Sequence, residues 1–207
     1  SISLREGNPV AIVAATPGSI LDSLVGVFTP QGELIDLNDN FFGTGSVLLF
    51  NPFRTGEHWL VVKGASEESV GPYTLIVHTP PLLSPPYTAA DEITIPGDVL
   101  VYQMQLKETQ VHDFAATGVD HFQPLVALTD PYMNVIASGV SDATTPMALI
   151  HGFTPLQDEV LYLYTMGMDT SMTGNFGLDV TLVEDQPDGI ELKHGDIFSG
   201  VIGPVGD

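Results

Sequence analysis

The chain has 207 residues, enough for one large domain or two of ordinary size, and 43% of them are hydrophobic, which allows a buried core. It carries 26 Asp and Glu against 5 Lys and Arg, a formal net charge of −21 at pH 7. This scarcity of basic residues excludes nucleic acid and anionic membrane surfaces as partners. No apolar run reaches the roughly 20 residues that a membrane-spanning helix needs, so no membrane insertion is expected.

Cysteine is absent, which excludes disulfide bonds, thiolate metal sites and cysteine nucleophiles. Residues 1–5 lack the basic and apolar regions of a signal peptide, so any targeting segment is expected to lie outside the chain or to have been removed. With 21 glycines and 16 prolines, the composition favours many turns and short strands.

Strand periodicity runs through the first 80 residues, and no segment carries a sustained helical period. Residues 33–37, for example, mix polar Glu33 and Asp36 with apolar side chains and are predicted to form a half-buried strand, and residues 38–40 then open a loop. The predicted strands of this part are 10–14, 24–28, 33–37, 47–50, 58–63 and 73–78. Short strands at this spacing, separated by turn residues, are typical of an antiparallel β-sandwich.

An internal repeat with an offset of about one hundred residues organises the sequence. Leu4-Arg5-Glu6 recurs as Leu106-Lys107-Glu108, and residues 71–75 (Gly-Pro-Tyr-Thr-Leu) recur as residues 174–178 (Gly-Asn-Phe-Gly-Leu). Residues 56–62 match residues 158–164 more loosely, in an alignment that sets Trp59 opposite Leu161. Because the order of the motifs is the same, the chain contains two copies of one unit.

These patterns predict an all-β protein of two tandem antiparallel β-sandwich (jelly-roll-like) domains with an extra C-terminal strand segment. The first sandwich covers residues 1–79 and lacks its opening strand. The Pro-rich segment 80–92 is predicted to be a stiff, extended linker. The second sandwich covers residues 93–184, and residues 185–207 hold a second linker and the opening strand of a third repeat.

The repeats are out of register with the ends of the chain. Residues 93–102 open the second unit, whereas Ser1 already matches Gln103, so the first unit has no such opening. Residues 200–207 resemble the end of that opening segment. We therefore expect the tail to dock on the first sandwich of a neighbouring copy, with docking in cis as the alternative. The apolar side chains expected to make this contact are Phe198, Val201, Ile202 and Val205.

The order of several short motifs resembles the bacterial pre-peptidase C-terminal domain family, a calcium-associated jelly-roll-like sandwich. The motifs are Leu4-Arg5-Glu6-Gly7, Leu21-Asp22-Ser23-Leu24, residues 30–35, residues 38–40, residues 56–62 and residues 71–75. The resemblance covers nearly all of residues 1–79 and is patchier over 93–183. It implies an extracellular, non-catalytic accessory or structural role, in which the chain belongs to a larger secreted polypeptide.

The best candidate metal site is the acidic segment around residues 36–40, because calcium takes six to eight oxygen ligands from Asp, Asn and loop carbonyl groups. The predicted ligands are Asp22, Asp36, Asn38, Asp39 and Asn40, and the resemblance places the acidic loop of the family at the last three. The alternative is an Asx-turn loop that hydrogen-bonds to its own backbone without a metal.

Other candidate sites are weaker. The pairs His112-Asp113 and Asp120-His121 fit no zinc signature and are predicted to be surface polar residues. Trp59 and Tyr73 lie among apolar neighbours and are predicted to be core residues, not a platform for sugar stacking. The sequence contains neither a Gly-x-Ser-x-Gly nucleophile motif nor a Gly-rich phosphate loop, so no enzymatic activity is expected.

Two functions follow. The first is a non-enzymatic extracellular or cell-surface structural protein, whose copies assemble head to tail into a filament or surface layer by strand donation. The alternative is an accessory substrate-binding or spacer module of a secreted peptidase or other hydrolase. The oligomeric state of the chain discriminates between them.

Overall fold

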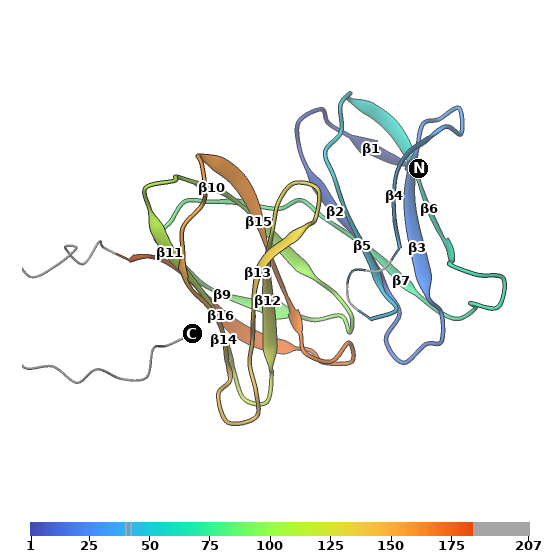
Figure 1. Ribbon diagram of the computed structural model, residues 1–207. Helices are drawn as coiled ribbons and strands as arrows, with labels where there is room; N and C mark the ends of the chain where they lie inside the picture. The colour runs from blue at the N-terminus through green and yellow to red at the C-terminus, as the bar shows by residue number, and fades with distance from the viewer. Residues whose placement is uncertain (40, 42, 184–207) are drawn as a thin grey trace, which may run out of the picture.

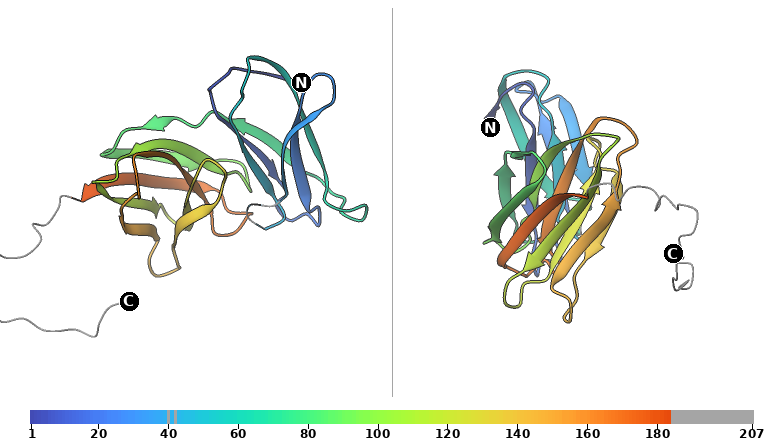
Figure 2. Two further views of the ribbon diagram at one scale, coloured as in Figure 1. Left: turned by 45° about the horizontal axis from the view of Figure 1, so that its top comes forward. Right: turned by 90° about the vertical axis from the view of Figure 1, so that its left-hand side faces the viewer.

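The computed structural model describes residues 1–39, 41 and 43–183, and these residues form strands and loops without any helix. The all-β class predicted from the sequence is confirmed. Two antiparallel β-sandwiches lie side by side, as Figures 1 and 2 show. Within the part of the chain that the structure describes, no helix is long and apolar enough to cross a membrane.

Seven strands build the first sandwich: β1 (Ile2–Leu4), β2 (Val10–Ala15), β3 (Ser23–Phe28), β4 (Leu34–Asp39), β5 (Ser46–Phe50), β6 (Gly56–Gly64) and β7 (Thr74–His78). They form a four-stranded sheet in the order β1-β6-β3-β4 and a three-stranded sheet in the order β5-β2-β7. Both ends of each of the six strands predicted from periodicity lie within two residues of the ends of an observed strand. The predicted loop at 38–40 differs, since β4 continues through Asp39.

Nine strands build the second sandwich: β8 (Leu82–Leu83), β9 (Tyr87–Ile93), β10 (Leu100–Leu106), β11 (Val111–Gly118), β12 (Pro124–Thr129), β13 (Val135–Val140), β14 (Met147–Phe153), β15 (Glu159–Gly167) and β16 (Gly174–Val183). They form a five-stranded sheet in the order β13-β12-β15-β10-β8 and a four-stranded sheet in the order β14-β11-β16-β9. Apart from β8 and β9, each strand has a counterpart in the first sandwich.

The four sheets stack into four layers with three apolar cores between them. One core lies inside the first sandwich and another inside the second. The third lies between the sandwiches, where residues of β2 and β5 pack against residues of β10, β12 and β15. Strand β2 is therefore buried on both faces, which explains its continuous apolar sequence.

The range 80–92, expected as a stiff spacer, instead contains β8 and most of β9. Leu83 pairs with Met104 of β10, and β9 pairs with β16 along its whole length. Leu83 is 4% exposed and Ile93 is 1% exposed. Burial of these two side chains holds the segment on the second sandwich, and this outweighs the preference of a Pro-rich sequence for an extended, solvated spacer.

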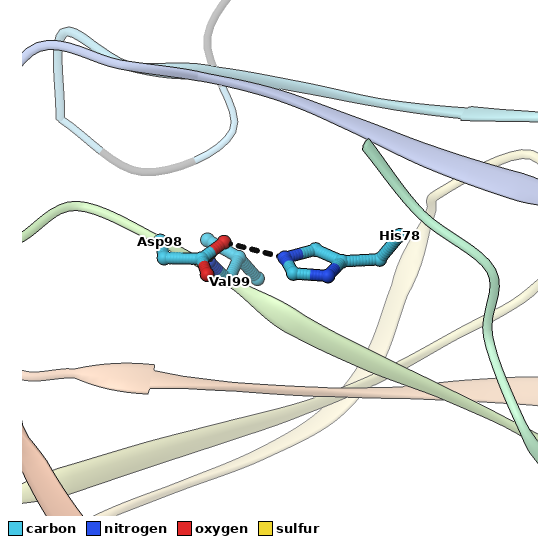
Figure 3. Close-up of polar contacts among 3 residues, drawn as sticks. All are labelled: His78, Asp98 and Val99. Atoms are coloured by element: carbon cyan, nitrogen blue, oxygen red, sulfur yellow. Dashed lines mark hydrogen bonds and ion pairs between the residues drawn. The ribbon is translucent and has the colours of Figure 1, made fainter. Parts of the chain in front are cut away.

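A polar contact ties the two sandwiches together beside their shared core (Figure 3). The Nε2 atom of His78, the last residue of β7, lies 2.7 Å from Oδ1 of Asp98, which is 6% exposed. The same oxygen accepts the backbone N–H of Val99 at 2.7 Å. The preceding Gly97 has a φ of +79°, and a Cβ there would lie 3.0 Å from Cβ of Ala15, so this close approach requires glycine.

Candidate functional site

Strand β7 leaves one edge of the first sandwich open. Its counterpart in the second sandwich, β16, pairs with β11 on one side and with β9 on the other. Strand β7 pairs with β2 on one side only, and no strand within the described residues covers its other side. An uncovered edge presents a row of backbone N–H and C=O groups that another strand can pair with.

Strand pairing shows which positions of β7 and β16 are equivalent. Ile12 of β2 pairs with Val77, just as Phe114 of β11 pairs with Val180. Two residues earlier along the edge strand, Leu75 corresponds to Leu178 by the same criterion. The offset of 103 residues also equates Tyr73 with Phe176, as the sequence repeat predicted.

The equivalent side chains differ sharply in exposure. Phe176, Leu178 and Val180 are 0%, 1% and 0% exposed, and all three belong to the core of the second sandwich. Tyr73, Leu75 and Val77 are 49%, 39% and 37% exposed. Three side chains whose equivalents are buried in the core of the second sandwich therefore lie partly open to solvent along the free edge of the first.

The opposite sheet of the first sandwich is also shorter than its counterpart. Strand β1 has three residues where β10 has seven, and β1 covers only the first three residues of β6. Leu60 and Val62, beyond that point, are half-buried, whereas the equivalent Leu163 and Thr165 are each 0% exposed. The open β7 edge and the uncovered end of β6 together form what we call the open edge of the first sandwich.

The residues predicted to dock on this edge, Phe198, Val201, Ile202 and Val205, lie outside the described residues. Their docking stays a prediction.

The structure divides the predicted calcium ligands between the two faces of β4. Asp36 and Asn38 lie opposite Val27 and Val25 of β3, on the face turned toward the core, and the amide nitrogen of Asn38 donates to the carbonyl oxygen of Val47. Asp39, one residue further, points to the outer face because side chains alternate along a strand. The structure therefore does not bring Asp36 and Asp39 to one point.

Asp22 lies in the loop before β3, where its backbone contacts Ser69, and its Oδ1 atom is buried without a hydrogen-bond partner. Asn40 lies outside the described residues. Among residues 1–39, 41 and 43–183, no group of three or more His, Cys, Asp or Glu side chains is placed to hold a metal ion. The calcium site stays a prediction.

The His112-Asp113 pair differs from the surface residues expected, whereas Asp120 and His121 are exposed as predicted. His112 is 1% exposed, and both of its ring nitrogens are buried without a hydrogen-bond partner. Burial lowers the pKa of His112, so its imidazole is neutral at pH 7. Asp113 accepts hydrogen bonds from His151 Nδ1 at 2.9 Å and from the Gly152 N–H at 2.7 Å. Although burial raises its pKa, these bonds hold the pKa of Asp113 below its ordinary value.

Trp59 and Tyr73 were predicted to be core residues, and this is wrong for both. Tyr73 is exposed because, among the residues that the structure describes, no counterpart of the strand that covers Phe176 lies beside it. Trp59, 47% exposed, lies on the outer face of β6. Pairing sets His58, not Trp59, at the position of Leu161, because Ile2 pairs with His58 as Met104 pairs with Leu161. The loose sequence alignment was one residue out of register, which exchanges the two faces of a strand.

Comparison with known proteins gives only distant similarities. No family model matches the chain, and no curated protein matches it significantly. Among solved structures, the pre-peptidase C-terminal domain of a collagenase from Bacillus anthracis is 19% identical over 49% of this chain and 93% of that one, with a TM-score of 0.41. A structure of infectious bursal disease virus, Gt strain, is 11% identical over 87% of this chain and 56% of that one, with a TM-score of 0.25. Neither similarity assigns a family or a function.

Proposed function

We propose that this chain is a non-enzymatic, extracellular structural protein whose copies assemble head to tail by strand donation. The open edge of the first sandwich carries the proposal. A strand paired with β7 would occupy the place that β9 has beside β16 in the second sandwich. It would cover Tyr73, Leu75 and Val77, and it would satisfy the free backbone groups of β7.

The proposed donor is residues 196–202 of a neighbouring copy. An offset of 109 residues aligns Ile202 with Ile93, and the following Gly206-Asp207 with Gly97-Asp98. The same offset aligns Phe198 with Ala89, which pairs with Leu178. In this register Phe198 lies opposite Leu75.

The register also separates inward from outward side chains of the donor. Ile93 is 1% exposed, so Ile202 is expected to point into the core, whereas Glu92 is exposed, so Val201 is expected to point to solvent. Burying a large apolar side chain contributes about 1.5–3 kcal/mol. The register therefore narrows the set of contact residues expected from the sequence. Phe198 and Ile202 are expected to determine the affinity, whereas Val201, on the solvent side, is expected to matter little and is no longer counted among the contact residues.

The order of strands within the chain favours donation in trans. Strands β8 and β9, which complete the second sandwich, follow directly after β7, the last strand of the first sandwich. Residues 196–202 follow in the same way after β16, the last strand of the second sandwich. A donated tail would therefore continue the internal pattern, completing the sandwich that comes next in the series.

The experiment is to measure mass by light scattering and sedimentation velocity across a range of concentrations. The wild-type chain is compared with Phe198→Asp/Ile202→Asp and with Val201→Asp as the matched control. Salt of about 0.15 M or more is needed to screen repulsion between chains of net charge −21. We expect polymers for the wild type and the control, and monomers for the double variant.

A wild-type chain that stays monomeric at every concentration would refute the proposal, and it would favour the accessory spacer or binding module. Polymers that persist unchanged in the double variant would also refute it.

A further inference from the structure

The outer face of the β1-β6-β3-β4 sheet carries an apolar patch that the strand-donation proposal does not use. Phe28 of β3 pairs with Trp59 of β6, and Gly26 pairs with Val61 on the same face. Leu37 of β4 lies on the other side of Gly26. Trp59, Leu37 and Val61 are 47%, 45% and 36% exposed. We call this patch the Trp59 face.

The equivalent face of the second sandwich is buried. Strand pairing identifies the equivalent residues. The pair Phe28–Trp59 of the first sandwich corresponds to Thr129–Tyr162 of the second, so Tyr162 is the equivalent of Trp59. The pair Gly26–Val61 corresponds to Ala127–Tyr164, so Tyr164 is the equivalent of Val61. Tyr162 and Tyr164 are 4% and 0% exposed, within the core between the sandwiches. Equivalent faces of the two sandwiches thus differ: this face packs against the other sandwich in the second unit, whereas it is exposed in the first.

The docked face rests on the outer face of β2 and β5. That surface is made of small and medium apolar side chains, including Ala11, Val13 and Ala15 at 0%, 1% and 1% exposed, together with Val47. Small side chains on a sheet face let another sheet approach closely, so this surface is complementary to the larger side chains opposite it.

The second sandwich presents the equivalent surface to solvent on β11 and β14. Ala115 pairs with Leu149 as Val13 pairs with Val47, so Ala115 and Leu149 occupy the centre of this surface. Leu149 is 38% exposed and the neighbouring Met147 is 36% exposed. We call this the β11-β14 face.

We propose that the Trp59 face of one copy docks on the β11-β14 face of a second copy, repeating the contact that joins the two sandwiches within the chain. This inference rests on the proposed function, because it requires assembly with a second copy of the chain. The residues that make the face contact are different from those of strand donation. The neighbour that donates its tail to the open edge is the same neighbour that presents this face. Within the chain, the second sandwich likewise receives β9 from the segment after the first sandwich and docks on the β2-β5 face of that same sandwich.

Charge offers one complementary contact to this occupant, on a face that also carries Asp39. Lys63, on β6 two residues beyond Val61, is exposed and lies on the Trp59 face. Across β11 and β16, Asp113 pairs with Thr181 and Ala115 pairs with Asp179. Asp113 and Asp179 therefore lie on the same face as Ala115, next to the apolar centre of the β11-β14 face. One of the five basic residues of an acidic chain therefore lies where it can face carboxylates of the neighbouring copy.

Trp59 is the only tryptophan of the chain, so its fluorescence reports directly on this contact. The experiment measures its emission maximum and its quenching by acrylamide as the concentration of the full chain rises. The variants are Leu149→Glu on the acceptor face and the matched control Val140→Glu, which places the same charge at an exposed position of β13, outside that face. Mass is measured on the same samples.

In assembled wild type and Val140→Glu, we expect a blue shift of the emission and a severalfold lower quenching constant. Leu149→Glu is expected to keep Trp59 accessible. Assembly with Trp59 fully accessible would overturn the docking of this face and leave strand donation standing. Protection of Trp59 in Phe198→Asp/Ile202→Asp would support the face contact while strand donation fails. A monomer with accessible Trp59 at every concentration would overturn both.

Discussion

Leu75 and Leu178 occupy equivalent positions in two copies of one repeat, yet the first side chain is 39% exposed and the second only 1%. The strands that carry them, β7 and β16, each pair with one neighbour in the same way. The difference comes from the other neighbour, β9, which only the second sandwich has within the described residues.

The second unit is completed by a segment that follows the last strand of the unit before it. Strand β9 comes after the last strand of the first sandwich, but its Ile93 lies in the core of the second, and its Tyr87 packs against that core. In repeat proteins of this kind, stability is shared between the units and the contacts that join them. Within residues 1–39, 41 and 43–183, the first sandwich has no strand that plays the part of β9.

The largest expected difference between the sandwiches concerns Phe176 and Tyr73. Phe176 is 0% exposed and its ring stacks on Phe122 with centroids 5.8 Å apart, so Phe176→Ala is expected to lower the free energy of unfolding by about 3–5 kcal/mol. Tyr73→Ala is expected to cost less than about 1 kcal/mol in the unassembled chain. Urea unfolding in the Phe198→Asp/Ile202→Asp background measures both. Equal losses would contradict the view that the first core is open at this edge.

The contact between the sandwiches is the next largest effect. Asp98→Ala removes the acceptor of Val99 N–H and leaves His78 without its carboxylate partner. Because this site is buried, we expect the free energy of unfolding to fall by about 1–3 kcal/mol. Glu92→Ala, at an exposed position nearby in sequence, is the matched control and is expected to change little. An unchanged Asp98→Ala variant would show that the apolar core alone joins the sandwiches.

Acidity should weaken the second sandwich through His112. Its pKa is lowered by burial, so below the ordinary histidine value of about 6.5 the unfolded state binds more protons than the folded state, and stability falls as the pH decreases. His112→Leu is expected to reduce the loss of stability between about pH 7 and pH 5, whereas a change at the exposed His121 is not. Chemical unfolding at both pH values measures this. Identical slopes for wild type and His112→Leu would contradict it.

The smallest effect concerns the proposed calcium site. Calcium bound only to the folded state raises the melting temperature by mass action. With Asp36 and Asp39 on opposite faces of β4, we expect a small rise, and we expect Asp39→Ala to remove it. Calorimetry with calcium and with chelator is the measurement, and Glu33→Ala, at an exposed position outside the predicted ligand set, is the control. Equal melting temperatures in calcium and chelator would leave the metal-free Asx-turn interpretation.

Much of the fold could be predicted from local patterns. Alternation and turn residues placed the strands of the first sandwich, and the repeat predicted that Tyr73 matches Phe176. Exposure could not be predicted in this way, because the burial of Tyr73 depends on whether a distant segment pairs with β7. The Trp59 face was missed for a different reason. Trp59 was expected in the core because its neighbours are apolar, and the alignment of β6 with β15 was one residue out of register. The pairing of Ile2 with His58 shows that His58, not Trp59, faces the core.

Hydrogen exchange of the β7 backbone tests the central claim most directly, because amide protection reports strand pairing at this edge. In assembled wild type we expect residues 74–78 to be as protected as the equivalent part of β16, and in Phe198→Asp/Ile202→Asp we expect them to exchange much faster. Protection of β16 should be the same in both proteins. Equal exchange of β7 in wild type and variant, in samples shown by mass to be assembled and monomeric, would contradict strand donation to this edge.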